Sequence, residues 1–258
     1  MQIPLFPLHT VLAPGIALPL HIFEERYRAM VKRCLDTSSP FGIVLIREGS
    51  EVAPRNGTTQ ELSICVVGTF AEIREASKYV DGRWDLLTVG TGRFVVREVI
   101  ADREPYLLGE VEELGDALGD EEAAEELVRR VTRRFVDYLR LLQPLDGEDA
   151  EPIDVQVEVE VPDDADDDEE PEVVATTGGG PVELAAALHI PDDPSQLSFL
   201  LTGIVQIDPA IRQALLEADS AEARLRDLDR LLDRELALLD MRLAPFQADR
   251  RTLLASAN

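Results

Sequence analysis

The sequence predicts an α+β protein in which a small N-terminal β-barrel precedes a C-terminal bundle of helices. Short apolar runs separated by turn residues fill the first 115 residues, whereas apolar positions recur every three or four residues from Glu121 onward. About six short strands and one helix cannot hide their edges in a flat sheet. A closed or nearly closed pseudo-barrel is therefore expected, followed by helices that end in one long helix.

The predicted strands are short apolar segments with turn residues between them. They cover residues 3–8, 16–20, 41–46, 63–75, 86–99 and 107–113. The first two are joined across the turn residues Ala13, Pro14 and Gly15, and Asp81-Gly82 predicts a tight turn between the fourth and fifth, which are expected to pair. Apolar residues at helical spacing predict one helix over residues 23–35.

The second half of the chain carries helix signals. Asp120 is the predicted N-cap of a helix over residues 121–142, and shorter helices are expected over 182–188, 196–205 and 210–217. Ser220 begins a helix that runs to about residue 244, where Pro245 should end or kink it. Its leucine stripe favours packing in the bundle core, with a coiled-coil seam as the alternative.

The acidic residues are concentrated in one segment. Residues 146–172 contain fifteen carboxylates and no Lys or Arg. Such a segment is expected to be solvated and mobile, with alternating valines at 155–161 as a possible strand, and it could also attract basic segments. The predicted organisation is a β subdomain at 1–115, a first helix at 116–145, an acidic insertion at 146–181 and the remaining helices at 182–258.

Composition excludes several classes of function. A net charge of −26 and a pI near 4.4 argue against nucleic acid and anionic membranes as partners, because both need clustered Lys and Arg. No apolar run reaches the roughly 20 residues of a membrane span, and the N-terminus lacks a signal-peptide pattern, so a soluble cytoplasmic protein is expected. Cys34 and Cys65 are expected to be buried, reduced thiols.

Catalytic and metal-binding patterns are missing from the sequence. Three scattered histidines, His9, His21 and His189, do not have the spacing of a metal site, and no cofactor is expected. The glycines at 178–180 lack the lysine of a phosphate-binding loop. The sequence therefore predicts a protein that is not an enzyme. An enzyme that has reused the barrel would need a deep polar pocket with two carboxylates of displaced pKa.

A series of short motifs occurs in order along the chain. They are Phe6-Pro7-Leu8, Pro14-Gly15, Leu18-Pro19-Leu20-His21-Ile22-Phe23-Glu24, Arg26-Tyr27-Arg28, Phe41-Gly42-Ile43-Val44-Leu45, Val67-Gly68-Thr69, Ala71-Glu72-Ile73, Gly92-Arg93-Phe94, Pro105-Tyr106-Leu107, Arg212-Gln213-Ala214-Leu215-Leu216-Glu217 and Arg224-Leu225. In sequence and spacing they resemble the N-terminal domain of Lon proteases, the module thought to recognise substrates ahead of the ATPase. Cereblon contains a related Lon-like domain.

This resemblance implies a PUA-like pseudo-barrel followed by a helical bundle with a long last helix. It also implies a stand-alone, non-catalytic substrate-recognition module, since neither an ATPase phosphate loop nor a matching serine–lysine protease motif occurs in the chain. Its partners would be unfolded or misfolded polypeptides and a separate ATP-dependent protease, for which it would act as an adaptor in quality control. The alternative is an interaction scaffold that self-associates or docks to a protease through its C-terminal helix.

Six residues are the candidate peptide-binding residues: His21, Glu24, Arg26, Tyr27, Arg93 and Phe94. The competing interpretation is structural: Glu24 would favour a helix N-terminus, Arg26 would pair with a strand carboxylate, and Phe94 would be a core residue beside a solvated Arg93. Two binding modes are open. A client segment could add a strand to an exposed barrel edge, or its apolar side chains could enter a groove between barrel and bundle.

Overall fold

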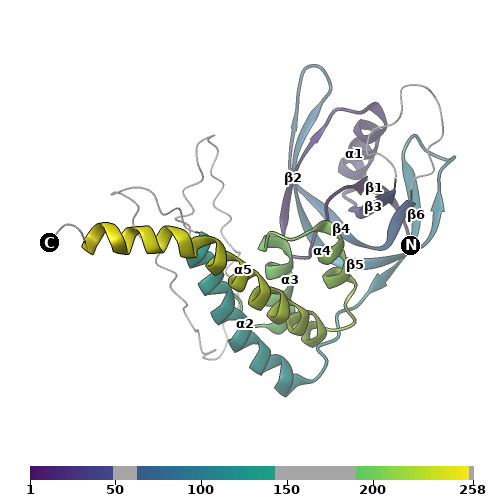
Figure 1. Ribbon diagram of the computed structural model, residues 1–258. Coiled ribbons are helices and arrows are strands. Elements are labelled where there is room, and N and C mark those ends of the chain that lie inside the picture. Colours follow the sequence, from purple (N-terminus) through teal and green to yellow (C-terminus); the bar gives the residue numbers. More distant parts are fainter. Residues whose placement is uncertain (49–62, 143–189, 256–258) are drawn as a thin grey trace, which may run out of the picture.

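A computed structural model describes residues 1–48, 63–142 and 190–255, and it confirms the α+β class with the β part first (Figure 1). The elements are β1 (Gln2–Leu8), β2 (Ala17–Ile22), α1 (Glu25–Thr37), β3 (Phe41–Glu48), β4 (Ser63–Lys78), β5 (Trp84–Ile100), β6 (Leu107–Leu114), α2 (Glu121–Leu142), α3 (Pro194–Ile204), α4 (Pro209–Glu217) and α5 (Ala221–Ala255). The predicted helix at 182–188, the acidic insertion and the valine strand lie outside the described residues.

The strands close into a barrel because β5 pairs with three neighbours. The sheet order is β2-β5-β4-β3-β1-β6, and an additional β5–β6 pairing closes the ring. The first half of β5, from Trp84 to Val89, pairs with β2, and its second half, from Arg93 to Ile100, pairs with β6. The predicted β4–β5 hairpin is confirmed. β1 and β2, although joined across the Pro14-Gly15 turn, are not paired with each other.

The barrel interior is packed by aromatic and aliphatic side chains. Phe94 is fully buried in one core cluster, and a Cβ atom on either Gly42 or Gly68 would lie 2.5–2.6 Å from its ring. These two strand positions therefore have no room for a larger residue beside Phe94. Helix α1 contributes Tyr27 and Met30 to a second cluster. Both cysteines are buried and free, as predicted.

The bundle is built on α2 and α5, which pack side by side, with α3 and α4 between them and the barrel (Figure 1). Side chains cap the helices where the sequence predicted: Asp120 accepts from the Ala123 amide at 2.9 Å, and Ser220 accepts from the Ala223 amide at 3.1 Å. No helix in the described part of the chain is long and apolar enough to span a membrane.

Pro245 was expected to end or kink the last helix, and the expectation of an end near residue 244 is wrong. Helix α5 continues through Pro245 to Ala255. The proline ring fixes φ at a value that a helix allows, and a helix accommodates the lost hydrogen bond and the crowded carbonyl four residues earlier by bending rather than stopping. The helix consequently runs past the end of α2 and projects from the bundle (Figure 1).

Candidate functional site

The barrel and the bundle meet along α3 and α4. Barrel residues Val11, Leu45 and Val67 form an apolar cluster with Phe199 of α3 and Leu216 of α4. This cluster gives the seam a continuous apolar contact. Polar groups at the seam then fix the position of the bundle relative to the barrel. Two grooves open beside the seam.

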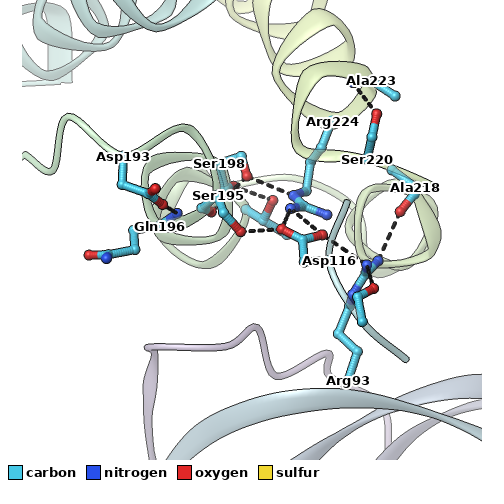
Figure 2. Close-up of polar contacts among 12 residues, drawn as sticks. Arg93, Asp116, Asp193, Ser195, Gln196, Ser198, Ala218, Ser220, Ala223 and Arg224 are labelled. Atoms are coloured by element: carbon cyan, nitrogen blue, oxygen red, sulfur yellow. Dashed lines mark hydrogen bonds and ion pairs between the residues drawn. The ribbon is translucent and has the colours of Figure 1, made fainter. Parts of the chain in front are cut away.

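Two buried arginines and one carboxylate connect the halves (Figure 2). Asp116 follows β6, and its Oδ1 accepts from Arg93 of the barrel at 2.8 Å and from Arg224 of α5 at 3.0 Å. Its Oδ2 accepts a second bond from Arg224 at 2.8 Å and one from the Ser195 hydroxyl at the start of α3. Arg224 also donates to Ser198 at 2.8 Å. One carboxylate therefore contacts the barrel, α3 and α5.

Arg93 also closes the C-terminal end of α4. Its Nη1 donates to the carbonyls of Leu216 and Ala218 at 2.7 and 2.8 Å, and its Nη2 donates to the Gly115 carbonyl at 2.9 Å. The last carbonyls of a helix have no partner inside the helix and carry partial negative charge, so a guanidinium is a favourable group there. Arg93 thus holds the end of α4 against the barrel.

Both guanidiniums are removed from water. The Arg224 side chain is 0% exposed and the Arg93 side chain 2% exposed. Burial lowers the pKa of each from its ordinary value, and Asp116 opposes that shift. The Phe199 ring gives a further contact, because the Arg224 Cζ lies 3.6 Å from its centroid. Arg93 Nε and Arg224 Nη1 are buried without a hydrogen bond within the described residues, so the arrangement carries a desolvation cost.

An apolar groove of about 590 Å³ opens directly beside this network. The barrel side contributes Pro14, Ile16 and Leu114, and the bundle side contributes Phe199 and Leu200. Arg93 and Asp116 also line it. The volume lies in the range of sites that hold small ligands or a few side chains. We call this cavity the barrel–bundle groove.

A second groove, of about 610 Å³, lies between β3, β4 and α4. Its lining is more polar and includes His9, Arg47, Asp208 and Glu217. Gln213 is also part of the lining, and it donates to the Val67 carbonyl at 3.0 Å and to Glu217 at 2.8 Å. This groove suits an apolar segment less well than the barrel–bundle groove does.

The six candidate peptide-binding residues do not form one site. Tyr27 and Phe94 are core residues at 5% and 0% exposure, and Arg93 is buried in the network. The expectation of a solvated Arg93 is wrong, because the end of α4 and Asp116 cover it. Glu24 pairs with Arg26 at 3.0 Å, and Arg26 lies over the Tyr27 ring at 4.4 Å.

His21 lies elsewhere, on β2 beside the turn end of the β4–β5 hairpin. Its Nδ1 is 2.6 Å from Asp85, which also accepts from the Tyr79 hydroxyl. Both contacts lower the pKa of the Asp85 carboxyl group, and the hydrogen bond from Tyr79 has the larger effect. Phe23, Tyr79 and Val80 are exposed around it at 52%, 45% and 110%. We call His21, Phe23, Tyr79 and Val80 the hairpin-tip patch. Tyr79 and Val80, two large residues directly before the Asp81-Gly82 turn, are the sequence signal that could have indicated it.

The unpaired strand edges carry features that oppose strand addition. Within the described residues, β2 has one unpaired edge, and it contains Pro19, which lacks an N–H to donate. The second half of β4 also has an unpaired edge, where the register shifts between Ile73 and Glu75 and where Glu72 and Arg74 form an exposed ion pair. Proline, bulges and charges are the usual protections of an edge, so the groove is the better candidate for a binding site.

Metal chemistry has no support among the residues described. Over residues 1–48, 63–142 and 190–255 no three His, Cys, Asp or Glu side chains are grouped so that they could hold an ion. The buried network contains a single carboxylate, Asp116, whose two oxygens are already bound by arginines and a serine.

Removing the Asp116 charge should destabilise the protein strongly. Asp116→Asn leaves two buried guanidiniums without their counter-charge, and breaking a buried ion pair costs about 3–5 kcal/mol. Glu112→Gln is the matched control, because its pair with Arg97 is exposed (62% and 66%) and such pairs contribute about 0–1 kcal/mol. Urea unfolding of both variants measures the difference. Equal losses of stability would show that the network does not hold the two halves together.

Comparison with known proteins identifies the family. The protein family described as "ATP-dependent protease La (LON) substrate-binding domain" matches residues 2–234 of the chain. Lon protease 2 of Herpetosiphon aurantiacus is 25% identical over 242 residues, which are 93% of this chain and 25% of that protein. The chain therefore spans about a quarter of the length of this curated relative.

Two solved structures share the fold. The N-terminal domain of the Mycobacterium avium complex Lon protease aligns with a TM-score of 0.59 and 16% identity, over 90% of this chain and 98% of that one. A Lon N-terminal domain protein from Xanthomonas campestris aligns with a TM-score of 0.52 and 22% identity, over 88% of this chain and 96% of that one. The family match, the ordered motifs and the barrel-and-bundle fold agree: this chain belongs to the Lon substrate-binding domain family.

Proposed function

We propose that this chain is a non-catalytic recognition module that binds exposed apolar segments of unfolded polypeptides in the barrel–bundle groove. In this role it acts in the cytoplasm as an adaptor for a separate ATP-dependent protease. The observation that carries the proposal is an apolar groove of about 590 Å³ between the two halves of the molecule. Burial of one apolar side chain there supplies about 1.5–3 kcal/mol without any requirement for a defined sequence.

The geometry of the groove supports binding of many different clients. Its two walls come from separate halves, and the Asp116 network fixes their separation before a client arrives. A preformed groove avoids the ordering cost that a flexible site would have on binding. The hairpin-tip patch is a second contact area on the barrel, where exposed Phe23 and Tyr79 offer the aromatic surface common at protein contacts.

Binding can be measured by fluorescence anisotropy of a labelled, permanently unfolded polypeptide at physiological salt. We expect micromolar affinity for the unfolded form and none for its folded counterpart. Leu200→Ser, which removes an apolar wall of the groove, should weaken binding roughly tenfold. Leu35→Ser on α1, an exposed position that does not line the groove, should leave it unchanged. Absence of binding to the unfolded form would overturn the proposal.

The projecting part of α5 favours a second candidate function, a scaffold that self-associates. Helix α5 has 35 residues against 22 in α2, and Leu238 and Met241 on it are 44% and 73% exposed. An exposed apolar helix surface is a common site of association. If this candidate is right, light scattering should give a multiple of the chain mass that falls to one chain when Leu238 and Met241 are both replaced by Ser. One chain mass for the unmodified protein would contradict it.

A further inference from the structure

Of the charged residues that line the barrel–bundle groove in the described part of the chain, Glu113 and Asp116 are acidic and Arg93 is buried. Glu113 on β6 lines the groove, is exposed, and makes no salt bridge within the described part of the chain. Asp192 is exposed and follows the lining residue Pro191. Asp219 is exposed and close enough to Arg93 to oppose the lowering of its pKa by burial. Glu113 and Asp192 thus place negative charge at the edge of a groove that has apolar wall residues.

The arginines beside the groove are not accessible to a ligand, so they cannot offset the negative charge of these carboxylates. Among the described residues that line the groove, Arg93 is the one cationic residue. It is 2% exposed, and its Nη1 and Nη2 are already bound to three carbonyls and Asp116. Arg224 is fully buried and is not part of the lining. A client carboxylate would therefore meet Glu113 without an accessible counter-charge, whereas a client Lys or Arg would meet a carboxylate free to pair.

We propose that the barrel–bundle groove selects segments in which an apolar residue is flanked by Lys or Arg. This inference rests on the proposed function and specifies the class of segment that the groove takes. The apolar residue enters between Ile16 and Leu200, and the flanking cation reaches Glu113 or Asp192 at the edge. Long Lys and Arg stems suit this arrangement, because they cover apolar surface while their charged ends stay in water.

The test uses three labelled peptides with one apolar core and flanks of Lys, Gln or Glu, titrated by anisotropy at low and high salt. We expect the Lys peptide to bind about threefold more tightly than the Gln peptide and roughly tenfold more tightly than the Glu peptide at low salt. High salt should reduce these ratios, since exposed charges are screened.

Charge variants distinguish a local effect from the general negative charge of the protein. Glu113→Gln with Asp192→Asn should remove at least half of the preference for Lys flanks. The control variant, Glu98→Gln with Asp102→Asn, removes the same amount of charge near the C-terminal end of β5 and just after it. This variant should keep the preference for Lys flanks. A preference that survives equally in both variants would overturn the inference.

The remaining outcomes separate this inference from the proposed function. If all three peptides bind equally and Leu200→Ser still weakens their binding, the groove binds apolar segments but does not select for flanking charge. The proposed function then stands and this inference is wrong. If none of the peptides binds, both proposals fail together. Only a flank preference that depends on Glu113 and Asp192 supports the inference.

Discussion

The position of the bundle on the barrel depends on one carboxylate between two buried arginines. Asp116 is bound by Arg93 from the barrel and by Arg224 from the longest helix, and Arg93 also holds the last carbonyls of α4. A buried ion pair is costly to desolvate, and apolar residues of equal volume often stabilise a protein as well or better. The contribution of this ion pair is orientation. Its hydrogen bonds have fixed directions, and they hold α3, α4 and α5 in one position against the strands.

That placement creates the barrel–bundle groove. The apolar seam of Val11, Phe199 and Leu216 would tolerate sliding, because apolar contacts have no preferred direction. The Asp116 network prevents this and keeps the walls of the groove apart. The same network engages both arginines, so that Glu113 and Asp192 at the edge of the groove have no salt bridge within the described residues. The placement of the groove walls and the burial of the arginines beside them thus depend on the same cluster.

Much of the fold could be predicted from local patterns. Alternating and clustered apolar residues located the six strands, and Asp120 and Ser220 marked two helix starts, because these signals act over a few residues. The closed barrel followed from the number of strands. The end of α5 could not be predicted from Pro245, since the cost of one lost hydrogen bond depends on what surrounds the helix.

The site was harder to predict than the fold. Asp116 lies 23 residues from Arg93 and 108 from Arg224, and no local pattern shows that either arginine is buried. Arg93 and Phe94 were candidate contact residues, with a core Phe94 beside a solvated Arg93 as the competing interpretation. Phe94 is in the core, but Arg93 on the opposite side of β5 is also buried, because the bundle covers that side. The groove residues Ile16 and Leu200 are ordinary apolar residues, so only the tertiary structure identifies them.

The central claim is that an unfolded client lies in the groove that the Asp116 network forms. Photo-cross-linking tests it most directly: a photoreactive residue is placed at Leu200 in the groove, at Phe23 in the hairpin-tip patch, or at Leu35 on α1, and an unfolded client is added. We predict strong cross-links from position 200, weaker ones from position 23 and none from position 35. Cross-links from position 23 with none from position 200 would contradict the claim and move the binding site to the hairpin tip.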